Sequence, residues 1–311
     1  MSKIPVERTI GDTYRFAFTN VLSIFGIAWL PCAIMAALIG AAVWWMWPDL
    51  AAIDYSAQTD TARNQEIVLQ LAAKVLTVMF PLYLLVYVFY AMVITGVQRK
   101  ALGLIEGPVF VYFSLGGEVW RLIGAMILAG LLICAGGLLA VIAVAIVFWI
   151  GHLNGMPAIY GLVEFVAVVA GVCWFYYMAV RLVFFLPPVV VAEGGFGLAR
   201  SWALGNGNFW RIVLLFLACV FGPMVVISMV SNIVFAPFMM GVALKLQQAV
   251  EANQVVPPEQ VFAMIFEPLR RLWPYWLAYE LVTMPILLGL SNAISALAYR
   301  NVTAAPQEAN A

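Results

Sequence analysis

The sequence predicts an all-α fold: a polytopic membrane protein with six transmembrane helices arranged as three hairpins, together with interfacial amphipathic helices. The first observation is six long apolar runs with almost no charge. A helix of about 20 apolar residues crosses the hydrocarbon core of a bilayer. The second is composition, because 65% of the 311 residues are hydrophobic, 10% are charged and the mean hydropathy is +1.02. The runs lie near residues 20–47, 67–98, 122–150, 160–190, 210–243 and 273–299.

The domain organisation follows from these runs. We expect a single membrane domain over residues 1–300, with hairpins at about 20–98, 121–190 and 210–299, and a short polar cytoplasmic tail at 301–311. Lys3, Glu7 and Arg8 precede any apolar stretch, which is not the pattern of a cleaved signal peptide. The chain is therefore expected to insert through its own first span.

Basic residues predict the orientation of these spans. With six spans, ten of the fifteen Lys and Arg residues fall on the side of the N-terminus, and the other five fall on the opposite side. Lys and Arg concentrate in cytoplasmic loops, so both termini are predicted to be cytoplasmic in a bacterial inner membrane. The ten are Lys3, Arg8, Arg15, Arg99, Lys100, Arg121, Arg181, Arg200, Arg211 and Arg300.

Short amphipathic segments precede the first and fifth spans. Asp12 and Arg15 oppose an apolar face made by Ile10, Tyr14, Ala17, Phe18 and Val21. Such a helix is expected to lie on the inner leaflet. Phe196, Ala199, Trp202 and Ala203 suggest a second helix of this kind before the fifth span.

Two spans begin alike, which is the third observation behind the hairpin arrangement. Residues 117–123 read GEVWRLI and residues 207–213 read GNFWRIV. This similarity suggests helical hairpins repeated in one orientation. The alternative is that a Trp-Arg pair marks any inner interface. The candidate lipid-interface residues are Arg15, Trp120, Arg121, Arg181, Trp202, Trp210 and Arg211.

Three ionisable residues lie within predicted spans at a similar depth. They are Lys74, Glu164 and Glu280, near the outer ends of the second, fourth and sixth spans. Charged groups at membrane depth are costly, so they suggest a polar pocket facing outward. Alternatively, each side chain extends separately to the interface.

One segment carries a family resemblance. The stretch RLVFFLPPVVVAEGGFGLARSWALGNGNFWR resembles a family of functionally uncharacterised bacterial six-span membrane proteins, which includes the membrane domain of some glycerophosphoryl diester phosphodiesterases. The matching residues are Arg181, Pro188, Glu193, Gly194, Ser201, Trp202, Leu204, Phe209, Trp210 and Arg211. The likeness covers roughly 30 residues of the chain and is only hydropathic elsewhere. It implies a six-span fold in the inner membrane but no diesterase reaction, because too few residues follow residue 300 to encode the catalytic barrel.

The sequence offers no motif for catalysis, cofactors or metals. It lacks the nucleophile, phosphate-binding and zinc motifs, and Cys32, Cys134, Cys173 and Cys219 fall inside apolar runs. A formal net charge of zero does not favour nucleic acid. We therefore expect a non-enzymatic protein without cofactors that interacts with or organises lipids or membrane partners. The alternative is a small-molecule or lipid transporter or flippase with a polar pocket between hairpins.

Overall fold

The computed structural model describes residues 3–51, 61–153, 157–251 and 258–308, and these segments are helical without strands. The elements are α1 (Val6–Thr19), α2 (Val21–Ala51), α3 (Thr61–Ala101), α4 (Gly117–Leu153), α5 (Pro157–Val183), α6 (Leu186–Glu193), α7 (Leu198–Gly205), α8 (Phe209–Phe216), the π-helical turn η1 (Leu217–Phe221), α9 (Gly222–Glu251) and α10 (Pro258–Glu308).

Six of the described segments are long and apolar enough to cross a membrane, as predicted. They are Val21–Met46, Ala72–Ala101, Gly117–Val147, Gly161–Glu193, Phe209–Ala236 and Leu272–Ala304. The protein is therefore an all-α, multi-pass membrane protein. Helix α10 continues past residue 300 to Glu308, with Val302 buried.

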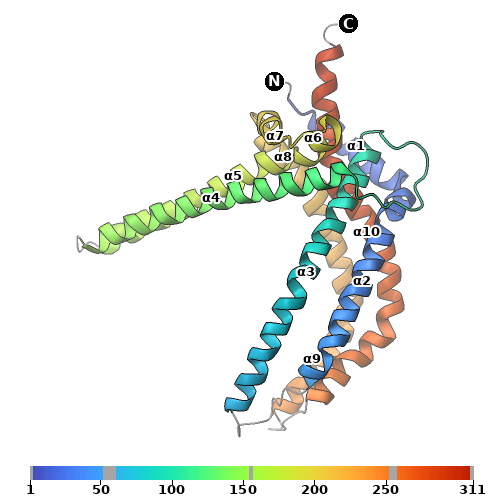
Figure 1. Cartoon of the computed structure of the whole chain (residues 1–311), viewed down its shortest axis with the longest axis vertical. Coiled ribbons are helices and arrows are strands. Elements are labelled where there is room, and N and C mark those ends of the chain that lie inside the picture. The colour runs from blue at the N-terminus through green and yellow to red at the C-terminus, as the bar shows by residue number, and fades with distance from the viewer. Residues whose placement is uncertain (1–2, 52–60, 154–156, 252–257, 309–311) are drawn as a thin grey trace.

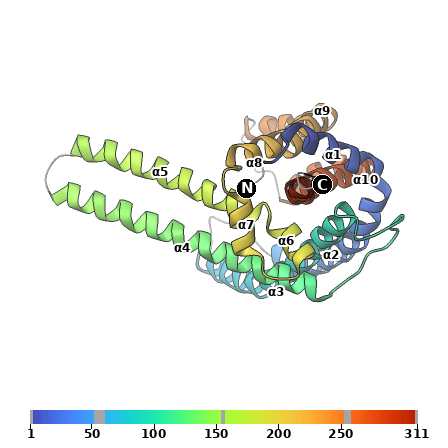
Figure 2. The same cartoon turned by 90° about the horizontal axis from the view of Figure 1, so that it is seen from above.

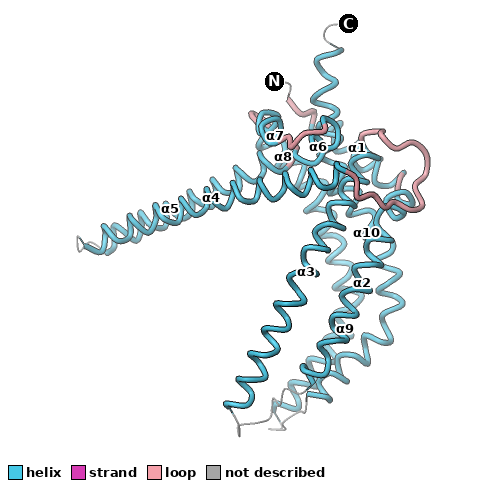
Figure 3. Tube along the Cα trace, in the orientation of Figure 1, coloured by secondary structure: helices cyan, strands magenta, loops and turns pink. Residues whose placement is uncertain are grey.

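The six spans form a bundle and an arm. Helices α2, α3, α9 and α10 run together from the end of the molecule where both termini lie (Figure 1). Helices α4 and α5 pack against each other but leave this bundle and extend sideways, which the view from above also shows (Figure 2). We call this α4–α5 hairpin the arm. We call the end with the termini the cap, made by α1, α6, α7, α8 and the loop 102–116 (Figure 3).

The buried core lies near the cap. Three apolar clusters join the last turns of α3 and α5, the first turns of α2 and α4, and the C-terminal half of α10. Apolar contacts between helices gain little in lipid, because acyl chains are equally apolar. A buried polar contact adds specificity: Gln98 of α3 donates hydrogen bonds to the Asn292 carbonyl at 2.7 Å and to Ser295 Oγ at 2.8 Å, both on α10.

Helix α1 docks on the bundle through a face that includes part of the predicted apolar one, namely Ala17 with Ile10 and Tyr14 partly buried. Its buried residues are Thr9, Thr13 and Ala17, and it packs along α10. Asn301 of α10 donates a hydrogen bond to Thr9 Oγ1 at 3.2 Å. The expected apolar face is only partly turned to the protein, since Phe18 is exposed. Small polar side chains permit this close contact with α10.

Tyr14 joins α1 to the π-helical turn. In this turn the Gly222 N–H donates to the Leu217 carbonyl, so the Ala218 carbonyl loses its usual helical donor. Pro223, the next residue, has no N–H to offer. The Tyr14 hydroxyl donates to the Ala218 carbonyl at 2.8 Å and fills this vacancy. Burial raises the pKa of the Tyr14 phenol above its usual range, with a smaller contribution from Cys219, so the hydroxyl stays protonated as a donor.

The loop between α3 and α4 lies against the bundle. We call its residues 108–114 the strap. The Val109 N–H donates to Ser23 Oγ at 3.3 Å, and Trp29 Nε1 donates to the Phe110 carbonyl at 2.9 Å. Both partners belong to the span Val21–Met46. Non-helical backbone at membrane depth is tolerated when the protein supplies such partners.

Gly26 makes the close approach of the strap possible. A Cβ atom at this position would lie 2.0 Å from the Val109 carbonyl oxygen. The outward face of the strap is apolar and exposed, with Phe110 75% exposed and Phe113 51% exposed. The strap thus presents an exposed aromatic surface at the edge of the molecule, within the cap.

Candidate functional site

The site with the most unusual chemistry lies around Arg181, in the last turn of α5. This side chain is only 6% exposed. Its guanidinium carbon lies 3.8 Å from the centre of the Trp202 ring and 5.2 Å from the centre of the Tyr177 ring. Nη1 donates to the Tyr177 hydroxyl at 2.6 Å and Nη2 donates to the Trp202 carbonyl at 3.3 Å, while the buried Nε has no hydrogen-bond partner.

Local backbone geometry positions Trp202 on Arg181. Gly197 has a left-handed φ of +66°, which turns the chain into α7. The buried Ser201 hydroxyl donates to the Leu182 carbonyl at 2.8 Å and joins α7 to α5. Gly205 lies against the backbone of Arg181, because a Cβ there would be 3.0 Å from the Arg181 carbonyl oxygen. The motif residues Ser201 and Trp202 thus place an aromatic ring over the arginine.

No carboxylate among the described residues pairs with Arg181. The ion pairs in this part of the chain are Arg99–Glu118 at 3.5 Å and Arg200–Glu193 at 3.2 Å. Stacking on aromatic rings recovers about 2 kcal/mol for a desolvated cation. Both hydrogen-bond acceptors of Arg181 are neutral, so its charge is not neutralised by these contacts.

The Trp-Arg pair at the start of α4 is directed partly into the protein. Arg121 Nη1 donates to the Gly194 carbonyl at 2.5 Å, and its Nε donates to the Gly117 carbonyl at 3.2 Å. Trp120 points outward and is 54% exposed. The arginine therefore holds the end of α6, while the tryptophan faces the surroundings.

In the second Trp-Arg pair, at the start of α8, the arginine again contacts the protein and the tryptophan is again exposed. Arg211 Nη1 donates to the Ile4 carbonyl at 2.6 Å, and Trp210 is 74% exposed. The buried Asn208 accepts a hydrogen bond from the Ile4 N–H at 3.1 Å. Both backbone groups of Ile4 are thus held by the start of α8, through Asn208 and Arg211. We call this contact the N-terminal clasp.

The candidate lipid-interface residues therefore differ in their environments. Arg181 and Trp202 come together in one site, whereas Arg121 and Arg211 donate hydrogen bonds to separate backbone carbonyls. Arg121 and Arg211 each donate to protein carbonyls, and their contact with lipid groups stays a prediction. Arg15 is exposed on α1. Sequence reasoning missed the clasp, although the Asn-x-x-Arg spacing of Asn208 and Arg211 places both residues at one helix start.

The structure does not bring the three intramembrane charges together. Lys74 on α3 is half-buried, with Nζ 5.8 Å from the centre of the Trp45 ring. Glu280 on α10 is also half-buried. Glu164 lies on α5 of the arm, and its side chain falls outside the described set. Because α5 packs on α4, α6, α7 and α8, the arm separates Glu164 from the helices that carry Lys74 and Glu280.

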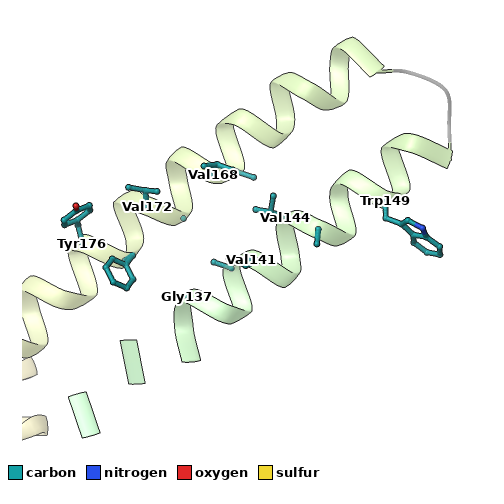
Figure 4. Close-up of a pocket in the computed structure, with 12 residues that line it drawn as sticks. Gly137, Val141, Val144, Trp149, Val168, Val172 and Tyr176 are labelled. Carbon is teal, nitrogen blue, oxygen red and sulfur yellow. The ribbon is translucent and has the colours of Figure 1, made fainter. Parts of the chain in front are cut away.

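An apolar groove of about 820 Å³ lies between α4 and α5 (Figure 4). Val141 and Val144 of α4 and Val168 and Val172 of α5 lie along it. Its lining includes a single hydroxyl-bearing residue, Tyr176, and no charged residue. The groove suits a hydrocarbon chain and offers little to a polar solute.

The searches for known relatives found no match: no family model, curated protein or solved structure matches the chain. The resemblance to the phosphodiesterase membrane domain stays a prediction. Among the described residues, no group of three or more His, Cys, Asp or Glu side chains could hold a metal ion.

Proposed function

We propose that this protein is a non-enzymatic integral membrane protein that binds and organises phospholipids along its arm. The observation that carries the proposal is the divergence of α4 and α5 from the bundle. Only 6% of the most apolar window of Gly117–Val147 is buried in the protein and none of that of Gly161–Glu193, against 50% for Leu272–Ala304. A span with so little protein contact presents its surface to acyl chains.

The groove supports the same proposal. It lies between two spans, where the medium is hydrocarbon, and its lining is almost entirely apolar. An acyl chain is the occupant whose chemistry fits both facts. A transport route for a polar solute would need polar groups to replace water along the path, as selective pores and transporters do. The groove between α4 and α5 does not supply them.

Filling the groove tests the proposal. Ala140 lines the groove, so Ala140→Phe should reduce the number of phospholipid molecules retained per protein, measured by native mass spectrometry after gentle detergent extraction. Ala135→Phe is the matched control, because Ala135 is exposed on the same helix and does not line the groove. Equal retention in both variants would contradict the proposal. A wild-type mass of two chains, lost in Ala140→Phe, would instead assign the groove to a second copy.

The proposed orientation places both termini in the cytoplasm of a bacterial inner membrane. Support comes from the excess of Lys and Arg on the side of the termini. Reporter fusions at residues 56 and 255, which lie outside the described residues, should read as periplasmic, and a fusion at residue 305 as cytoplasmic. A periplasmic signal at residue 305 would reverse the orientation or change the number of spans.

A further inference from the structure

Arg181 is a buried cation without a counter-ion among the described residues. A guanidinium has five N–H donors. Two of them meet the Tyr177 hydroxyl and the Trp202 carbonyl, both neutral, and the buried Nε has no partner. The guanidinium carbon lies 3.8 Å from the centre of the Trp202 ring and 5.2 Å from that of the Tyr177 ring. Because the N–H donors lie in the guanidinium plane, a further acceptor has to approach along its edge.

The surroundings of Arg181 suggest what that acceptor is. Arg181 lies at the cap end of its span, the same end at which Trp120 and Trp210 are exposed. Exposed tryptophans mark the membrane–water interface, where phospholipid phosphates lie. A guanidinium fork matches the oxygen pair of a phosphate group, and stacking on aromatic rings keeps its plane fixed.

Removing a charge from water without an ion pair costs several kcal/mol. Aromatic stacking and neutral hydrogen bonds offset only part of this cost. Glu193, the carboxylate at the end of α6 in the cap, is engaged elsewhere: it pairs with Arg200 and accepts a hydrogen bond from the Tyr299 hydroxyl at 2.9 Å. A bound anion at the edge of Arg181 would supply the missing charge.

We propose that Arg181, held between Tyr177 and Trp202, binds the phosphate of an anionic phospholipid at the cap-side interface. This inference rests on the proposed function and makes it more specific, since it assigns a headgroup preference to a lipid-binding protein. The residues around the guanidinium orient it, and the charge of Arg181 selects a net anionic headgroup over a zwitterionic one.

The test uses the whole protein in nanodiscs with equal amounts of phosphatidylglycerol and phosphatidylcholine. Native mass spectrometry should find wild type enriched in bound phosphatidylglycerol, and Arg181→Gln should lower the bound ratio of the two lipids about tenfold, the loss expected for one charge-assisted hydrogen bond. Arg8→Gln is the control, because Arg8 is an exposed arginine of α1 in the cap that is not among the candidate lipid-interface residues, and it should leave the ratio unchanged. Arg181→Lys keeps the charge and should retain part of the preference.

Equal retention of both lipids by wild type would overturn the inference, whether or not any variant folds. If inorganic phosphate raises the thermal midpoint of wild type but not of Arg181→Gln, and no lipid preference exists, the site binds free phosphate and the lipid assignment is wrong. Lipids retained without preference would leave the proposed function standing. Failure to retain any lipid would contradict that function itself.

Discussion

Gly26→Ala is expected to displace the strap from α2 and to destabilise the protein by about 3 kcal/mol, the upper end of the usual cost of overpacking. The new Cβ would lie 2.0 Å from a backbone oxygen of Val109, and backbone cannot move aside as a flexible side chain can. Alanine gains about 1 kcal/mol over glycine inside a helix, which offsets only part of this cost. The midpoint of thermal unfolding in detergent measures the change.

Gly40→Ala provides the matched control on the same helix. No heavy atom lies within 4 Å of a Cβ at this position, so the substitution should leave stability unchanged or raise it. The rate at which a Val109→Cys variant reacts with a water-soluble maleimide reports directly whether the strap has moved away from α2. This reaction rate should rise when Gly26→Ala is added to the variant and stay the same when Gly40→Ala is added. An unchanged rate in both backgrounds would show that the strap does not depend on Gly26.

The second large effect is expected at the N-terminal clasp. Arg211→Ala removes the donor to the buried Ile4 carbonyl, and Asn208→Ala removes the acceptor of its N–H. Leaving a buried polar group unpaired costs about 1–3 kcal/mol for each substitution. The double variant should therefore free residues 3–10 from the cap.

Hydrogen exchange over residues 3–10 measures this release. The exchange rate should increase in each single variant and most in the double variant, with little change in α3. Arg15→Ala is the control, since Arg15 is exposed on α1. Fast exchange at Ile4 in the wild-type protein would mean that the clasp does not hold the N-terminus.

Sequence predicted the spans because hydropathy and length determine whether a helix can cross a bilayer. The same physics explains why the arm could not be predicted. Apolar surfaces contact lipid or another helix at nearly equal free energy, so hydropathy does not say which spans pack together. The pairing of α4 with α5 in the arm depends on side-chain fit, such as the contact of Trp174 with Gly136, which has no periodic signature in the sequence.

The candidate site was predicted in its residues but not in its contacts. Arg181 and Trp202 were both expected at the interface, and the structure stacks one on the other. Their contact depends on the left-handed turn at Gly197 and on the Ser201 hydrogen bond, which are set by backbone geometry rather than by residue type. The packing face of α1 extends beyond the predicted apolar residues for a related reason, since it includes the buried Thr9 and Thr13, and Thr9 accepts a hydrogen bond from Asn301 of α10.

The central claim is that lipid surrounds the arm, and the accessibility of spin labels on its cysteines in bilayers tests this most directly. Cys134 on α4 and Cys173 on α5 are both exposed, whereas Cys219 is buried in the protein and serves as the reference. In single-cysteine proteins, labels at Cys134 and Cys173 should collide often with oxygen, which concentrates in lipid, and rarely with a water-soluble nickel complex. High accessibility to the nickel complex would reveal a water-filled path, and low accessibility to both reagents would place the arm against protein. Either result would contradict lipid binding along the arm.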